Sequence, residues 1–141
     1  MARCHENLFP GCAELGITYV AFSPMANGIL SGQFTAQSAF EKGDFRNSVR
    51  QYQKEGYQKA EKLLSLLKDL AKKKNCTMAQ LSLAWMLCKE DFIVPIPGSR
   101  KVNRLTENFE AQDVKLINYE IEKIDALLDS IDFDIFGGHS S

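Results

Sequence analysis

Residues 92–108 read FIVPIPGSRKVNRLTEN and carry the clearest structural signal of the chain. Residues 92–96 are apolar and rich in β-branched side chains, which predicts a short buried strand. Pro97-Gly98 is expected to end this strand, because glycine adopts a backbone geometry that a side chain would block. A helix is then predicted from about Ser99, whose hydroxyl can cap it. The apolar side chains of this helix recur on one face: Val102, Leu105 and Phe109.

The start of this predicted helix is basic. Arg100, Lys101 and Arg104 place three cations within about one and a half helical turns. Unpaired backbone N–H groups at a helix start attract anions, and the planar fork of arginine suits a phosphate group. Two interpretations stay open for the spacing alone. The turn binds a phosphate monoester, or its charges are solvated and bind nothing.

Composition limits the class of protein. The chain has 141 residues, 45% of them hydrophobic and 25% charged, with a formal net charge of −1. These values predict one soluble globular domain. A charge near zero predicts neither nucleic acid nor an anionic membrane as a partner, so any anion site is local. No apolar run approaches the ~20 residues of a membrane span. The first residues, MARCHENLFP, lack an apolar signal core, which favours the cytoplasm.

The four cysteines, Cys4, Cys12, Cys76 and Cys88, show no C-x-x-C spacing. In a reducing cytoplasm they are expected to be free thiols. Cys4-His5 could form half of a zinc site, but nothing in the sequence supplies the other half. No metal site is therefore predicted.

Periodicity predicts the remaining helices and a second strand. A short helix is expected over residues 6–15, and residues 17–22 form a β-branched and aromatic strand. The clearest helix spans residues 57–74, with apolar side chains at the spacing of one face. Thr77 and Gln80 form a capping box that opens the next helix. Pro10 is expected in the first turn of the first helix, and Gly16 just past its end. Trp85 is predicted to be a core residue rather than a ligand platform. A last helix is predicted over residues 118–131.

Two loops are candidates for ligand contact. Residues 23–32, SPMANGILSG, are small and punctuated by glycine, which lets backbone approach a ligand, although an ordinary connection has the same composition. Residues 33–56 form a long segment of weak pattern, and such segments are often lids or binding loops. Asp44-Phe45-Arg46 within it is equally consistent with a surface ion pair.

The order of these elements predicts an α/β fold. Strands 17–22 and 92–96 are separated by a long helical crossover, so they are expected to pair in parallel. Both are apolar throughout, which predicts cover on both faces. A two-stranded sheet leaves its own edges unpaired. The pattern therefore indicates part of a larger fold, or edges that pair with a second copy in a homo-oligomer.

Several stretches together resemble the C-terminal half of the aldo-keto reductases of bacteria, plants and fungi. They are ELGITYVAFSPMANGILSG, GDFR, CTMAQLSLAWML, IVPIPGSRKVNRLTEN and AQDVKL, and the resemblance covers about residues 6–131. It implies a partial (β/α)8 TIM barrel with residues 17–22 and 92–96 as its seventh and eighth strands. All of residues 1–141 would then be the C-terminal half of an NADP-dependent oxidoreductase domain. Barrels of this class often bind phosphate at the loops after those two strands.

The resemblance implies NADP(H) as the cofactor and small carbonyl compounds, aldehydes and ketones, as substrates that are reduced to alcohols. By matching position, Ser99, Arg100 and Arg104 would hold the 2′-phosphate, and Glu107 and Asn108 would contact the adenine side. The other implied cofactor-binding residues are Phe22, Ser23, Pro24, Met25, Gly28, Leu30 and Gly98. Phe22 stands where the family usually has a tyrosine, and its ring can still stack on nicotinamide.

The family's catalytic aspartate, tyrosine, lysine and histidine come from the first half of the barrel, and no residue here matches them. No catalytic residue is therefore assigned, and the 141 residues alone are expected to be inactive, since a complete barrel needs about 250 residues. The alternative is a non-catalytic nucleotide-binding or interaction module. Its open sheet edges would pair with a second copy or a partner chain.

Overall fold

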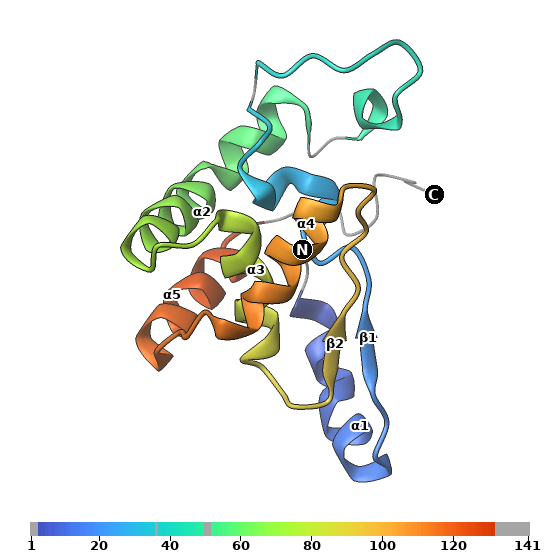
Figure 1. The fold of residues 1–141 in the computed structure, drawn as a ribbon, viewed down its shortest axis with the longest axis vertical. Coiled ribbons are helices and arrows are strands. Elements are labelled where there is room, and N and C mark those ends of the chain that lie inside the picture. The colour runs from blue at the N-terminus through green and yellow to red at the C-terminus, as the bar shows by residue number, and fades with distance from the viewer. Residues whose placement is uncertain (1–2, 36, 50–51, 132–141) are drawn as a thin grey trace.

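The computed structural model describes residues 3–35, 37–49 and 52–131. In these residues, two short strands stand at one side of a group of helices (Figure 1). The strands are β1 (Tyr19–Ala21) and β2 (Ile93–Pro95). The α-helices are α1 (Phe9–Leu15), α2 (Lys54–Lys73), α3 (Met78–Leu87), α4 (Val102–Phe109) and α5 (Asn118–Asp129). The 3₁₀ turns are η1 (Arg3–Leu8), η2 (Ala26–Ser31), η3 (Phe45–Ser48) and η5 (Glu110–Asp113).

The two strands pair in parallel, as predicted, and Val20 lies opposite Val94. Both are shorter than the predicted ranges 17–22 and 92–96. Each strand has a single neighbour, so only the residues that pair with that neighbour form the ladder. One further bond extends the pairing, from the N–H of Ile96 to the carbonyl of Ala21 at 3.0 Å. The chain is thus an α/β protein with a parallel sheet.

The two faces of the sheet differ. Ala21 and Ile93 are buried, and β2 packs against α3. The opposite face carries Val20, 54% exposed, and Val94, 46% exposed. This second face is therefore open in the part of the chain that the structure describes. Cover on both faces, expected from the apolar strands, is absent within the described residues.

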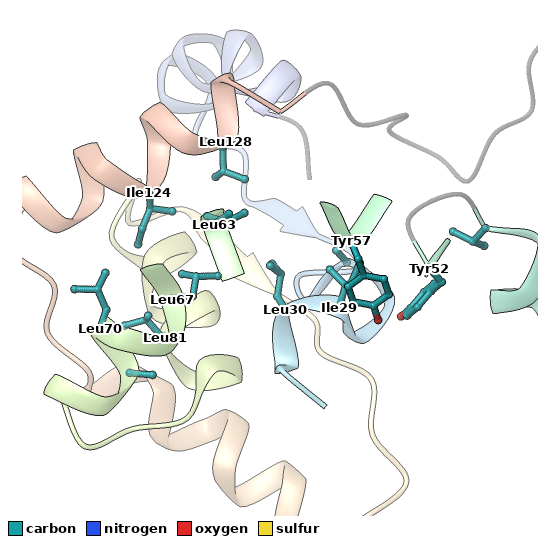
Figure 2. Packing of buried hydrophobic residues seen from close by; sticks show 13 residues of the cluster. Ile29, Leu30, Tyr52, Tyr57, Leu63, Leu67, Leu70, Leu81, Ile124 and Leu128 are labelled. Atoms are coloured by element: carbon teal, nitrogen blue, oxygen red, sulfur yellow. The ribbon is translucent and has the colours of Figure 1, made fainter. Parts of the chain in front are cut away.

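The core lies among the helices rather than on the sheet (Figure 2). The predicted stripe of α2 is confirmed, and its buried side chains meet α3, α5 and the turn η2. The helix begins at Lys54, three residues before the predicted start at 57, and Tyr57 lies on its buried face. Labelled members of the cluster are Ile29, Leu30, Tyr52, Tyr57, Leu63, Leu67, Leu70, Leu81, Ile124 and Leu128.

Helix α3 is the most deeply buried element. The capping box is confirmed: Gln80 N–H donates to Thr77 Oγ1 at 3.1 Å, and Thr77 N–H donates to Gln80 Oε1 at 2.9 Å. Trp85 packs against the core, as predicted. Its Nε1 donates to Asp125 Oδ1 at 2.8 Å, which joins α3 to α5. The two helices therefore hold each other through a polar contact as well as apolar packing.

The start of α4 corrects one prediction. The helix begins at Val102 rather than near Ser99, and Lys101 is its N-cap residue, without a side-chain cap bond. Ser99 Oγ instead accepts from the N–H of Lys101 at 3.1 Å, in a local turn before the helix. The prediction that Ser99 caps the helix is therefore wrong. The apolar face with Val102, Leu105 and Phe109 is exposed.

The ends of the chain are described in part. Pro10 lies in the first turn of α1, and Gly16 follows its end with φ of 65°, both as predicted. Cys12, Cys76 and Cys88 are free thiols, whereas the side chains of Cys4 and His5 fall outside the described residues. The last predicted helix ends at Asp129 instead of 131.

The described residues contain neither a side-chain cluster suited to a metal ion nor a helix suited to cross a membrane. No group of three or more histidine, cysteine, aspartate or glutamate side chains there is arranged to hold a metal ion. None of the described helices combines the length and apolar character needed to cross a membrane.

Candidate functional site

The two segments with candidate binding residues follow the two strands. One runs from Phe22 to Leu30 after β1, and the other from Gly98 to Asn108 after β2. Because the strands are parallel, both segments leave the sheet at the same edge. Figure 1 shows the turn η2, in lighter blue, next to α4, in orange. The carboxyl edge of a parallel sheet is where α/β proteins usually bind ligands.

The first segment has a strained backbone. Three residues other than glycine adopt positive φ: Ser23 at 47°, Ala26 at 48° and Asn27 at 57°. This conformation costs a non-glycine residue roughly 1–2 kcal/mol. Gly28 follows with φ of 106°, a conformation that favours glycine. Such strain is typical of functional sites and requires contacts that hold it.

The side chains of this segment divide between the interior and the surface. Pro24 and Leu30 are buried, and Met25 is partly buried. Phe22 and Ser23 are exposed, at the end of β1. The turn thus packs its apolar side chains inward and presents its first residues and backbone at the sheet edge.

The second segment carries the cations. Arg100 and Lys101 are exposed, and Arg104 is partly buried in the first turn of α4. Ser99, Glu107 and Asn108 are also partly buried. The structure therefore gathers the predicted basic residues at the start of α4, next to the strained turn.

Gly98 corrects a second prediction. Its φ is not in the left-handed region, and a Cβ placed on it would meet no atom within 4 Å. The conformation of this chain therefore does not require glycine at position 98. The strand ends earlier, at Pro95, and neither Pro95 nor Pro97 has an N–H to donate to a neighbouring strand.

Gln33 joins the two segments, and the sequence analysis did not single it out. Nη2 of Arg104 donates to Oε1 of Gln33 at 2.5 Å. Gln33 directly follows Gly32, whose φ is 70°. A Cβ on Gly32 would lie 2.6 Å from Met78 Sδ, so the close approach of α3 favours glycine there.

The loop after Gln33 is organised around Arg46. Its guanidinium carbon lies 4.9 Å from the centre of the Phe34 ring and 4.3 Å from that of Phe40. The ring of Tyr52 meets that of Phe40 edge to face at 5.1 Å. Nε of Arg46 donates to Asp44 Oδ1 at 2.9 Å, which confirms the ion-pair interpretation of this motif. The loop is therefore held by its own cation and rings.

This ion pair makes stability depend on pH. The hydrogen bonds from Arg46 lower the pKa of Asp44 from 3.8 to about 2. A carboxyl whose folded pKa is depressed contributes stability that is present above about pH 4 and is lost as the pH falls through about 2. We therefore expect Asp44→Asn to flatten the fall in unfolding free energy between about pH 5 and 2. Urea denaturation across this range measures the slope, and equal slopes for both proteins would contradict the assignment.

The fold and the site together define an α/β protein with basic residues at the carboxyl edge of a parallel sheet. The chain belongs to the aldo/keto reductase family, whose sequence model matches residues 1–129. It is 39% identical over 122 residues to aldo-keto reductase yakc of Schizosaccharomyces pombe, whose name carries NADP(+). It is 35% identical over 111 residues to aldo-keto reductase str7 of Strobilurus tenacellus. These alignments cover 86% and 79% of this chain but 36% and 33% of those proteins.

Solved structures agree with this assignment. The thermostable aldo-keto reductase Tm1743, crystallised with the inhibitor epalrestat, matches 89% of this chain with a TM-score of 0.59 and 26% identity. The glycerol dehydrogenase AKR11B4 of Gluconobacter oxydans matches 95% of this chain with a TM-score of 0.82. At 20% identity, the second likeness shows the fold alone. This chain covers 36% and 42% of those two chains, so it spans about a third of its curated relatives and a similar share of these structures.

Proposed function

We propose that this chain is the cofactor-binding C-terminal part of an NADP(H)-dependent aldo/keto reductase that acts on aldehydes and ketones. In this proposal all 141 residues belong to one oxidoreductase domain, and β1 and β2 are the seventh and eighth strands of a (β/α)8 barrel. The observation that carries it is the juxtaposition of a strained turn and a basic helix start at one edge of a parallel sheet. The NADP(+) in a relative's name supports the same cofactor.

The donor set fits a dinucleotide with a 2′-phosphate. Arg100 and Arg104 are fully charged forks that can donate two parallel bonds to one phosphate. The Ser99 hydroxyl would add a donor next to them, and Glu107 and Asn108, further along α4, would contact the adenine side. In the first segment, Ser23, Pro24, Met25, Gly28 and Leu30 would line the path of the pyrophosphate. An anion such as a phosphate suits this group of cationic donors.

The reaction assigns different tasks to the cofactor and the protein. The bound nicotinamide supplies the hydride, and Phe22, exposed at the end of β1, offers a flat ring on which it can stack. Gly98 belongs to the same cofactor segment by position. None of the tyrosines in the core serves as the proton donor in this proposal. Burial raises the pKa of Tyr52 to about 12, and an acid that weak is a poor donor near neutral pH.

We expect the purified chain to bind NADPH in the micromolar range and NADH at least about tenfold more weakly, because only NADPH offers a 2′-phosphate to the arginines. Isothermal titration calorimetry of the 141-residue chain with both cofactors measures this preference. Circular dichroism of the same sample serves as the control that the chain is folded. A folded chain that binds both cofactors equally, or neither, contradicts the assignment.

A second function is supported by the exposed apolar surface. Val20 and Val94 lie exposed on the open face of the sheet, with Phe22 and Ile96 exposed beyond the strand ends. A non-catalytic interaction module would cover this surface with a second copy or a partner chain. Light scattering after size exclusion distinguishes this candidate, since a monomer at every concentration argues against pairing between copies.

A further inference from the structure

We propose that Tyr52 is a positioning residue for the cofactor site, because its hydroxyl holds the strained turn that follows β1. The inference rests on the proposed function for its ligand, NADPH, but the anchoring itself depends on the contacts of this chain alone. Tyr52 lies just before α2 in the sequence, and its hydrogen-bond partner lies 25 residues earlier. Neither the spacing nor the residue type marks it as part of the site.

The contact that carries the inference is a single hydrogen bond. The Tyr52 hydroxyl donates to the backbone carbonyl of Asn27, one of the residues with positive φ. Asn27 lies in the part of the turn where its 3₁₀ geometry is interrupted, at Asn27 and Gly28. A bond to the carbonyl of a strained peptide opposes the rotation that would relieve the strain. The hydroxyl therefore stabilises the conformation seen here over a relaxed one.

The ring of Tyr52 is itself held in place. It is buried and meets Phe40 edge to face, with the Phe34 ring 5.8 Å away on a second side. A Cβ placed on Gly28 would lie 3.0 Å from Phe34 Cε2 and 3.5 Å from the Tyr52 hydroxyl oxygen. The Phe34 ring and the Tyr52 hydroxyl therefore lie close to the backbone of the turn at Gly28. This leaves little room for the turn to move towards the loop.

A second phenol gives a natural comparison. Tyr57 lies beside Tyr52, with 6.4 Å between ring centres, and both are shown next to Ile29 in Figure 2. Its side chain is equally buried, yet its hydroxyl has no hydrogen-bond partner among the described residues. Removing either hydroxyl leaves the packed ring unchanged. Only removal of the Tyr52 hydroxyl breaks a hydrogen bond to the turn.

The test compares Tyr52→Phe with Tyr57→Phe in the 141-residue chain. Native-state amide exchange is followed at Gly28 and Leu30, whose N–H groups both donate to the carbonyl of Met25. In Tyr52→Phe we expect exchange at these amides to accelerate about tenfold, the effect of one lost hydrogen bond, with little change within α2. We expect NADPH to bind about tenfold more weakly to this variant. Tyr57→Phe is expected to match the wild type in both measurements to within about twofold.

The outcomes separate the inference from the function on which it rests. A merely structural Tyr52 would lower global stability and accelerate exchange throughout α2 and α3, and would leave NADPH affinity of the folded chain unchanged. That result overturns the inference, as does equal behaviour of the two variants. If the wild type shows no preference for NADPH, the proposed function falls. The exchange pattern at Gly28 and Leu30 then still decides whether Tyr52 anchors the turn.

Discussion

Replacing Arg104 with alanine is expected to weaken NADPH binding by roughly 10- to 100-fold and to leave NADH binding within about twofold. The guanidinium lies in the first turn of α4, close enough to the segment after β1 to donate to Gln33 at 2.5 Å. A phosphate bound at the sheet edge would meet the Arg104 guanidinium already directed towards that edge. NADH offers no 2′-phosphate, so it loses no bond in the variant. Calorimetric titration of both cofactors into both proteins gives the two ratios.

Two further variants sharpen this measurement. Arg104→Lys keeps the charge but loses the planar fork, so its NADPH affinity is expected to lie between those of wild type and alanine variant. Lys68→Ala removes one positive charge from the exposed face of α2 and is expected to change neither affinity. Equal loss for NADPH and NADH in Arg104→Ala would show that this residue does not bind the 2′-phosphate.

Replacing Leu81 with alanine is expected to lower the free energy of unfolding by roughly 2–5 kcal/mol. Leu81 is 0% exposed and lies in α3, which packs against α2 and the turn η2. Truncation removes its buried methyl groups and leaves a cavity between helices that pack against each other in the core. A domain of this size is stable by only about 5–15 kcal/mol, so the loss is a large share of the total. Urea denaturation of the 141-residue chain measures it.

Leu105→Ala is the matched control, since the same atoms are removed from a side chain that is 51% exposed. Surface changes of this kind usually alter stability by less than about 0.5 kcal/mol. A comparable loss in both variants would mean that the face of α4 with Leu105 is covered in solution, for example by a second copy. The pair therefore also tests the open surface of this chain.

The parts of the fold that were predicted from sequence depend on neighbours within a turn or two. The capping box of Thr77 and Gln80 spans three residues, and the stripe of α2 follows from helical spacing. The parallel pairing follows from the long crossover between two apolar strands. The family was also visible in the sequence, because its motifs are short and continuous. The prediction failed at Ser99 and Gly98, where composition alone suggested a cap and a special backbone that the actual turn does not use.

The remaining parts of the candidate site rest on contacts between distant positions. Gln33 and Arg104 are 71 residues apart, and the bond from Tyr52 to Asn27 also crosses a long loop. A periodic pattern reports only which side of a helix or strand is apolar, so no pattern could have found these pairs. The packing of Arg46 against the rings of Phe34 and Phe40 could not be predicted for the same reason. Its ion pair with Asp44 was visible, because those residues are two positions apart.

Sequence was therefore sufficient for the helices, the parallel strands, the family and the basic start of α4, since all of these follow from local spacing and short motifs. Tertiary structure alone established that one face of the sheet is open and that the turn after β1 is strained. It also brought the Tyr52 hydroxyl to the carbonyl of Asn27 and the Arg104 guanidinium to Gln33. The physical reason is that strain and exposure depend on what surrounds a residue in space. Those surroundings come from residues far away along the chain.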